Sequence, residues 1–354
     1  MKSIKLYIPI LVSAIVFAFS FSACSDGISH EDTLANWKWD KVEANPAIVK
    51  QGWTNVDSVF GSLPAYVNVY LSPVKVTDVA NDHVIAYVAV ADMKRATFGV
   101  LGNVGWNDTA QGFCSTKLNT PTEFYNSSNA LIVINGGLFF ESNGFYYSQS
   151  LIYKDGNMLA PNQNYYSEDW TNFWYPTIGA FIQKPDKTFY TTWTYYANDG
   201  TDYSYDACKK IDLTKPETSA PDATHPSKGT ALNNTNVLNG IGGVSVLLHN
   251  GNIMDTYKDE MLDVSAASSQ PRTAIGYDPT NNKLMFFVCE GRLMTDGVAG
   301  LTTAQVATIL KALGCTEALN LDGGGSSCML VNGKETIKPS DGKERSVLDG
   351  CFIK

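Results

Sequence analysis

The sequence contains few histidines and lacks the motifs on which several common chemistries depend. Its 354 residues include four histidines, and its seven cysteines include no Cys-x-x-Cys pair, so a zinc cluster is not expected. No Gly-x-x-x-x-Gly-Lys-Ser/Thr loop, His-Glu-x-x-His helix or Gly-x-Ser-x-Gly turn occurs. The chain has no run of basic residues and a formal net charge of −9, which argues against nucleic acid as a partner.

The composition is that of a globular protein. Hydrophobic residues make up 44% and charged residues 17%, so the chain can bury a sizeable core in one large domain or two ordinary ones. An acidic protein that binds an anion must place arginines at the binding site, so single arginines can indicate where such a site lies. The six cysteines beyond Cys24 are spaced irregularly, and we expect them to be buried small apolar residues or to form one bridge.

The N-terminus is typical of a targeting segment. Two lysines precede an apolar run over residues 6–21, and Phe21-Ser-Ala-Cys24 follows. The run is short for a membrane span. A lipoprotein signal is one interpretation of this pattern, and the alternatives are a plain signal peptide and a membrane helix. The pattern predicts a lipoprotein signal over 1–23 and lipid modification of Cys24. The protein would then lie in the cell envelope, with membrane contact through the anchor, and 24–60 would be a tether and an N-terminal arm.

The rest of the chain, residues 61–354, predicts one large α+β catalytic domain, mostly antiparallel or mixed sheet with a few packed helices. One helix is clear, because Thr302 and Gln305 form a capping box, apolar residues follow at helical spacing, and Gly314 ends it. Apolar strands are expected at 84–90, 131–134, 246–249, 284–288, 318–321 and 328–331.

Residues 160–235 differ, since they are rich in aromatic and small polar residues without clear periodicity. We interpret them as an insertion. Its rings either form a small core of their own or, for one or two of them, line a cleft where sugar rings stack.

The most informative segment is Asn320-Leu-Asp-Gly-Gly-Gly-Ser-Ser327. Asp322 ends a short apolar strand, and Gly323, Gly324 and Gly325 follow it, then Ser326. Three glycines cost backbone entropy, which suggests positive φ angles or a close approach to the backbone. Successive bare N–H groups also form anion-binding concavities. The alternative is a tight turn between two packed strands.

Polar residues lie at the ends of three other predicted strands. Asn135 with Gly136 follows one, Arg272 begins another, and the pair Glu290 and Arg292 follows a third. Two arginines and two carboxylates suit an anionic substrate handled by acid–base chemistry, whereas each arginine alone could form an ordinary ion pair. Asp322 and Glu290 could also hold a calcium-like cation. We expect Asn135, Arg272, Glu290, Arg292 and Asp322 to lie around one pocket.

These segments, in this order, resemble the phosphodiester glycosidase family. The matching stretches are Asn135-Gly-Gly-Leu-Phe-Phe140, Gly242-Gly243, Pro271-Arg-Thr-Ala-Ile-Gly276, Glu290-Gly-Arg292, Gly300-Leu-Thr-Thr303, Ala318 to Ser327, and Glu344-Arg345. The first stretch departs from the family pattern in having Gly-Gly before Leu, and Glu290 stands where aspartate is common.

The resemblance implies hydrolysis of a sugar C1–O–phosphate linkage on a glycan or sugar-phosphate substrate. Asp322 or Glu290 would activate water or attack C1, and Asn135 would position a sugar hydroxyl or the water. The substrate would be held by Arg272, Arg292, Gly136, Gly323, Gly324, Gly325 and Ser326. The alternatives are a phosphodiesterase that cuts P–O and a glycan-binding lipoprotein without turnover.

Overall fold

The computed structural model describes residues 43–354, with gaps at 77 and 82. The predicted signal segment, Cys24 and most of the tether lie outside the described residues. Residues 44–354 form one compact unit. In the described part of the chain, no helix is long and apolar enough to cross a membrane.

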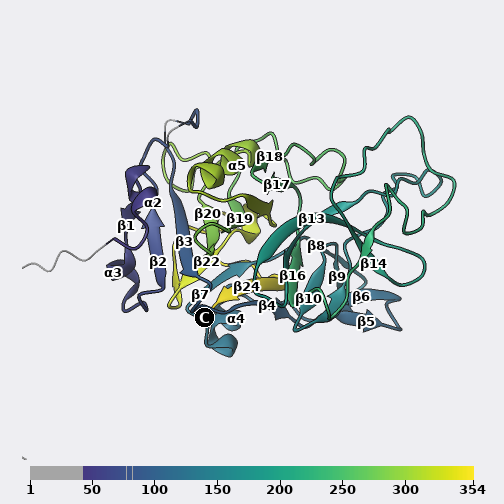
Figure 1. Cartoon of the computed structure of the whole chain (residues 1–354), viewed down its shortest axis with the longest axis horizontal. Helices are drawn as coiled ribbons and strands as arrows, with labels where there is room; N and C mark the ends of the chain where they lie inside the picture. The colour runs from purple at the N-terminus through teal and green to yellow at the C-terminus, as the bar shows by residue number, and fades with distance from the viewer. Residues whose placement is uncertain (1–42, 77, 82) are drawn as a thin grey trace, which may run out of the picture. The chain divides into compact units, whose positions relative to one another are not determined.

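The unit is built from four antiparallel sheets (Figure 1). The largest has eight strands in the order β1 (Thr54–Asn55), β2 (Val67–Leu71), β3 (Ala86–Asp92), β20 (Lys283–Cys289), β19 (Arg272–Asp278), β21 (Glu317–Asn320), β17 (Val246–His249) and β18 (Asn252–Ile253). The second has seven, in the order β11 (Asn157–Ala160), β10 (Ile152–Lys154), β16 (Asn239–Gly242), β12 (Ile178–Gln183), β13 (Phe189–Tyr196), β14 (Asp202–Tyr205) and β15 (Thr230–Ala231).

The two smaller sheets complete the unit. One has the order β23 (Lys334–Glu335), β22 (Met329–Val331), β7 (Ile132–Asn135), β24 (Asp349–Ile353) and β4 (Phe98–Gly102). The other has the order β5 (Gly105–Asn107), β6 (Gly112–Ser115), β9 (Phe145–Ser148) and β8 (Phe139–Ser142). The helices are short: α2 (Pro46–Lys50), α3 (Asp57–Phe60), α4 (Pro121–Ser128), α5 (Thr303–Ala312) and the 3₁₀ turn η1 (Gly324–Ser326). The predicted α+β class is confirmed.

The eight-stranded sheet is buried on both faces. Along β20, Leu284, Phe286 and Val288 join the main core between the sheets. The alternating residues Met285 and Phe287 face the other way and pack with residues of α5. A strand buried on both faces reads as a nearly continuous apolar run, which is why β3 and β20 are visible in the sequence.

The helix α5 follows the prediction closely. The Thr302 hydroxyl accepts a hydrogen bond from the Gln305 amide, and the Gln305 Oε1 accepts one from the Thr302 amide. Gly314 follows the helix with a φ of +104°. The helix α4 was not predicted, although Thr120 and Glu123 form the same kind of capping box. Its polar composition gives only a weak apolar stripe.

Part of the segment 160–235, which we interpreted as an insertion, belongs to a sheet of the domain. Strands β12 and β13 pair with each other, and β12 also pairs with β16, so they belong to the seven-stranded sheet. Trp193 is fully buried in the main core, and every residue of β12 is buried. These two central strands were not predicted, because the aromatic-rich segment shows no clear periodicity in the sequence.

The described part of the N-terminal arm packs on the domain. Strand β1 pairs with β2, and Trp53 is buried. The six cysteines of the described residues are free, and all but Cys208 are buried. This agrees with the expected role of most of them as small apolar residues.

The capping box of α5 generates the first prediction. Thr302→Ala removes an acceptor for the helix N-terminus and should lower the free energy of unfolding by about 1 kcal/mol in urea. Thr308→Ala, within the same helix, is the matched control. It removes a hydroxyl that bonds only to the Ala304 carbonyl, and alanine is the better helix former, so it should be neutral or slightly stabilising. Equal losses in the two variants would contradict the capping role.

Candidate active site

The antiparallel register brings three strand ends to one edge of the eight-stranded sheet. Arg272, the first residue of β19, pairs with Cys289, the last of β20, so Glu290 and Arg292 emerge beside it. Asn320, the last residue of β21, pairs with Ala274 of β19, and Asp322 follows two residues later. The strand ends therefore meet, as predicted.

The fourth strand end comes from the five-stranded sheet. Asn135 ends β7 and is buried. Its Oδ1 accepts hydrogen bonds from the Thr273 hydroxyl (2.7 Å) and the Cys328 amide (3.1 Å). Its Nδ2 donates to the carbonyl of Asp322 (2.8 Å). Asn135 thus fixes the glycine turn that follows Asp322 through hydrogen bonds. It is not among the residues that line the cavity described next.

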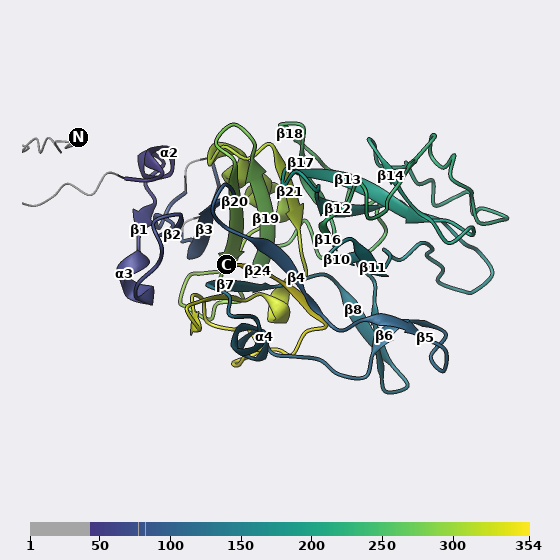
Figure 2. The same cartoon turned by 60° about the horizontal axis from the view of Figure 1, so that its bottom comes forward.

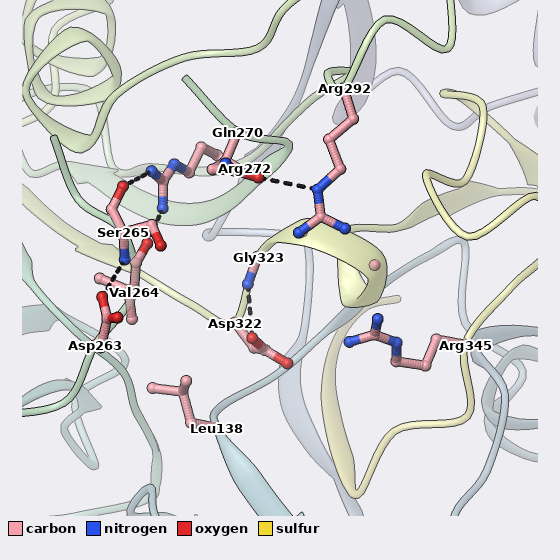
Figure 3. A pocket seen from close by; sticks show the side chains of 12 residues that line it. Leu138, Asp263, Val264, Ser265, Gln270, Arg272, Arg292, Asp322, Gly323 and Arg345 are labelled. Atoms are coloured by element: carbon pink, nitrogen blue, oxygen red, sulfur yellow. Dashed lines mark hydrogen bonds between the residues drawn. The ribbon is translucent and has the colours of Figure 1, made fainter. Parts of the chain in front are cut away.

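A cavity of about 240 Å³ opens at this edge (Figure 3). Asp322 and the three glycines line it, and Arg292 and Arg345 both point toward the turn. The remaining lining residues are Leu138, Asp263, Val264, Ser265, Gln270 and Arg272.

Asp322 is fixed through its backbone and its carboxylate. Its amide donates to the Gly136 carbonyl (3.0 Å), and its Oδ1 accepts from the Gly323 amide (2.8 Å). Burial raises the pKa of Asp322, while the Ser326 hydroxyl, the Gly323 amide and the Arg345 guanidinium act in the opposite direction. A partly desolvated carboxylate beside a cation suits a base or a nucleophile.

A backbone carbonyl and two guanidinium groups crowd the glycine turn, since a Cβ on Gly323 would lie 2.9 Å from the Pro271 carbonyl oxygen. A Cβ on Gly324, whose φ is +58°, would come within 2.6 Å of Arg292 Nη2. A Cβ on Gly325 would overlap the guanidinium of Arg345. With glycine at these positions both arginines lie against the backbone, and Gly324 adopts its positive φ without strain. Two of the glycine amides are already used, since Gly323 donates to Asp322 and Gly324 to the Pro271 carbonyl (2.9 Å).

Arg292 and Arg345 share one carboxylate. Asp341 Oδ2 accepts from Nε (2.8 Å) and Nη2 (2.6 Å) of Arg345, and its Oδ1 lies 3.8 Å from Nη1 of Arg292. The side chains are 45% and 42% exposed, so both remain accessible from the cavity. Arg292 has a φ of +56°, an uncommon conformation for a residue with a side chain and one that is often found at functional sites.

Arg345 was not predicted as a site residue. The sequence did carry a signal for it, because Glu344-Arg345 is one of the stretches in the family resemblance. Because Arg345 lies far from the glycine turn in the sequence, the pattern gave no reason to assign it a role in the site. The loop over 339–345 brings it back over η1, where its Nη1 donates to the Ser326 hydroxyl (3.4 Å).

Arg272 differs from the prediction. It borders the cavity, but its guanidinium turns toward the segment 264–268 (Figure 3). It donates to the carbonyls of Val264 (2.7 Å), Ser265 (2.7 Å), Ser268 (2.8 Å) and Leu301 (2.9 Å). A guanidinium with four backbone carbonyl partners holds the cavity wall in place. The guanidinium is therefore not oriented to bind phosphate through a pair of free N–H donors.

Glu290 does not line the cavity either. It is buried, and its Oε2 accepts from the amide of Lys338 (3.1 Å), which anchors the chain just before the loop that carries Asp341 and Arg345. Gly136 acts as a spacer, since a Cβ there would overlap the carboxylate of Asp349. Ser326 is the last residue of η1 and is buried.

Asp349 is a buried acid that sequence reasoning missed. Its Oδ1 accepts from the Gly137 amide (2.7 Å), and its Oδ2 has no partner among the described residues. Burial, opposed by the Gly137 bond and reinforced by the nearby Asp322, raises its pKa to about 7. A protonated Asp349 places no second negative charge beside Asp322.

Within residues 43–354, apart from 77 and 82, no three His, Cys, Asp or Glu side chains cluster closely enough to hold a metal ion. The calcium-like cation suggested from Asp322 and Glu290 stays a prediction.

The fold and this site define a domain of the phosphodiester glycosidase type. A family model described as phosphodiester glycosidase matches residues 128–354, more than half of the chain. The chain therefore belongs to the phosphodiester glycosidase family.

Two curated relatives match over shorter stretches. Over 83 residues the chain is 38% identical to an SPbeta prophage-derived uncharacterized protein of Bacillus subtilis, covering 23% of this chain and 12% of that protein. Over 111 residues it is 32% identical to the mouse N-acetylglucosamine-1-phosphodiester alpha-N-acetylglucosaminidase, covering 28% of this chain and 21% of that enzyme. The matches span about a fifth or less of these relatives.

Solved structures support the fold. The catalytic domain of zebrafish N-acetylglucosamine-1-phosphodiester alpha-N-acetylglucosaminidase, auto-inhibited by its pro-peptide, aligns with a TM-score of 0.53 at 20% identity, over 83% of this chain and 84% of that one. A hypothetical protein from Synechocystis aligns with a TM-score of 0.51 at 14% identity, over 85% and 67%. At these identities the likeness shows the fold alone.

The contrast between two arginines generates the second prediction. Arg272→Lys loses most of four charge-assisted bonds to backbone carbonyls and should lower the free energy of unfolding by about 3 kcal/mol. Arg292→Lys, at a half-exposed side chain, should change it by less than about 0.5 kcal/mol. Urea unfolding of both variants checks this. Equal stability of the two would show that Arg272 does not anchor the wall.

The buried acid generates the third prediction. The folded protein holds the Asp349 proton more tightly than the unfolded chain, because burial raises its pKa from 3.8 to about 7. This contribution to stability is complete at low pH and is lost as the pH rises through about 7. Asp349→Asn does not titrate but keeps an acceptor for the Gly137 amide.

We therefore expect the free energy of unfolding of the wild type minus that of Asp349→Asn to fall between about pH 4 and pH 7, by at most about 4 kcal/mol. Urea unfolding over this range measures it, with Asp296→Asn, at an exposed carboxylate outside the cavity, as the control. A difference that does not change with pH would contradict the assignment.

Proposed function

We propose that the protein is a hydrolase that cleaves a sugar C1–O–phosphate linkage. The observation that carries the proposal is a single cavity that combines one partly buried carboxylate, Asp322, with the guanidinium groups of Arg292 and Arg345. Membership of the phosphodiester glycosidase family supports this reaction class. The name of the mouse relative suggests a diester of N-acetylglucosamine 1-phosphate as the first substrate to test.

The chemistry needs little from a general acid. Cleavage of C1–O passes through an oxocarbenium-like transition state, and the departing phosphate is a good leaving group because its second pKa is about 6. Water attacks C1 and gives its proton to Asp322, the C1–O bond breaks, and the electron pair leaves on the phosphate oxygen. A carboxylate with a raised pKa is a better proton acceptor than an exposed one.

Arg292 and Arg345 take the role that we first gave to Arg272 and Arg292 together. Their guanidinium groups are held by Gln270, Ser326 and Asp341, and they would hold the phosphate and stabilise its developing charge. Arg272 and Asn135 act as positioning residues, because they fix the wall and the turn. Glu290 fixes the loop of Arg345 through Lys338.

The fourth prediction tests the reaction. Asp322→Asn should lower kcat on an N-acetylglucosamine-1-phosphate diester by about 100-fold or more, because amide oxygen is a poor base. Asp296→Asn, an exposed carboxylate outside the cavity, should retain activity. Undiminished turnover in Asp322→Asn would rule out its role as base or nucleophile.

The same wild-type reaction in oxygen-18 water identifies the bond that breaks. We expect the label on the sugar C1 hydroxyl. Label on the phosphate would make the protein a phosphodiesterase that cuts P–O. Tight binding of the diester without release would make it a glycan-binding protein.

A further inference from the structure

A second cavity, larger than the first, lies next to the candidate active site. It has a volume of about 660 Å³ and is lined mainly by aromatic rings, among them those of Trp106, Phe113, Phe140, Tyr147, Tyr165 and Trp170. We refer to it as the aromatic cleft. Its rings come from the small sheet of β5, β6, β8 and β9, at one end of the unit in Figures 1 and 2, and from the segment 161–170.

These rings are unusually exposed. Trp106 is 55% exposed, Phe140 45% and Trp170 73%. Large apolar side chains gathered around one hollow, instead of scattered singly, mark a binding surface. A cleft of this kind suits a ligand with an apolar face.

The rings are held in place by one another. Phe140 and Tyr147 stack with their centroids 5.2 Å apart and their planes 12° from parallel. Trp106 packs edge-on against Phe113 at 5.3 Å, and its Nε1 donates to Asp108 (3.0 Å). Such a preformed surface loses little conformational freedom when a ligand binds.

Neutral amides lie between the rings. Gln149 Nε2 donates to Gln163 Oε1 (2.9 Å), Gln163 Nε2 donates to the Tyr165 carbonyl (2.8 Å), and Asn164 Nδ2 donates to the Tyr196 carbonyl (2.6 Å). In the described chain, none of the residues lining the cleft is a lysine or an arginine. Aromatic faces with fixed amides match a ligand that presents C–H faces and hydroxyl groups and carries no negative charge.

The cleft and the active-site cavity share a wall. Asp263 lines both, and Leu138 of the first cavity leads directly into β8, which carries Phe140 of the second. A single ligand can therefore occupy both, with its phosphate at the arginines and its neutral part at the rings.

We propose that the aromatic cleft is a glycan subsite that binds uncharged pyranose units attached to the reacting sugar phosphate. This inference rests on the proposed function and deepens it, because it assigns the substrate to oligosaccharide-bearing diesters and not to the single sugar phosphate. Trp106 lies outside the stretch matched by the family model, so part of the subsite comes from the N-terminal half of the domain.

The fifth prediction tests the subsite by binding alone. The full chain is applied to an array of immobilised neutral oligosaccharides, and the strongest glycan is titrated by tryptophan fluorescence. Trp106→Ala and Trp170→Ala should each weaken its binding about five- to tenfold. Trp106→Phe and Trp170→Phe keep a ring face and should lose much less. Leu213→Ala, at a side chain that is 64% exposed elsewhere, is the control.

The outcomes separate the subsite from the reaction. No bound oligosaccharide, or equal binding by the Ala and Phe variants, would overturn the subsite even if the diester is hydrolysed. Glycan binding that Asp322→Asn retains, together with no hydrolysis by the wild type, would keep the subsite and overturn the reaction. Tryptophan-dependent binding to vesicles of zwitterionic phospholipid in place of glycans would assign the cleft to a membrane surface, against the proposal.

Discussion

The candidate site depends on one amide side chain that joins two sheets. Asn135 ends a strand of the five-stranded sheet, yet it bonds to Thr273 in the eight-stranded sheet, to the Cys328 amide and to the Asp322 carbonyl. Each of these groups is buried or partly buried, so leaving one unpaired would cost roughly 1–3 kcal/mol. Together with the bond from the Asp322 amide to the Gly136 carbonyl, these contacts fix the two sheets relative to each other at the place where the carboxylate lies.

The glycine turn was predicted to need positive φ angles or a close approach to its backbone, and the structure shows both. Gly324 has a φ of +58°, and Arg292 and Arg345 lie so close to Gly324 and Gly325 that a Cβ would contact them. Anion binding by the glycine amides stays a prediction. The backbone makes room for guanidinium groups, and these supply the positive charge. Their approach also opposes the effect of burial on the Asp322 pKa, through Arg345.

Local signals in the sequence predicted local structure. The capping box fixed α5 to within a residue, and continuous apolar runs gave β3, β7 and β20, because strands buried on both faces leave that trace. Polar residues at the strand ends predicted that those ends would meet if the strands shared one sheet, which holds for Arg272, Glu290 and Asp322 but not for Asn135. Side-chain direction was not predictable, since Arg272 and Arg292 look alike in the sequence but differ in their partners. The role of Arg345 and the central place of β12 and β13 depend on contacts between segments far apart in the chain.

The site also shows how a chain with a net charge of −9 can present a place for an anion. At physiological ionic strength charges are screened beyond about 8 Å, so the nearest groups decide the local potential. Asp341 offsets part of the charge of Arg292 and Arg345, but it also holds both guanidinium groups over the turn, so they would need little ordering to bind the proposed phosphate. Beyond Asp263 the lining changes to rings and neutral amides. The division of the cavity walls into charged and uncharged parts therefore matches the two halves of the proposed substrate.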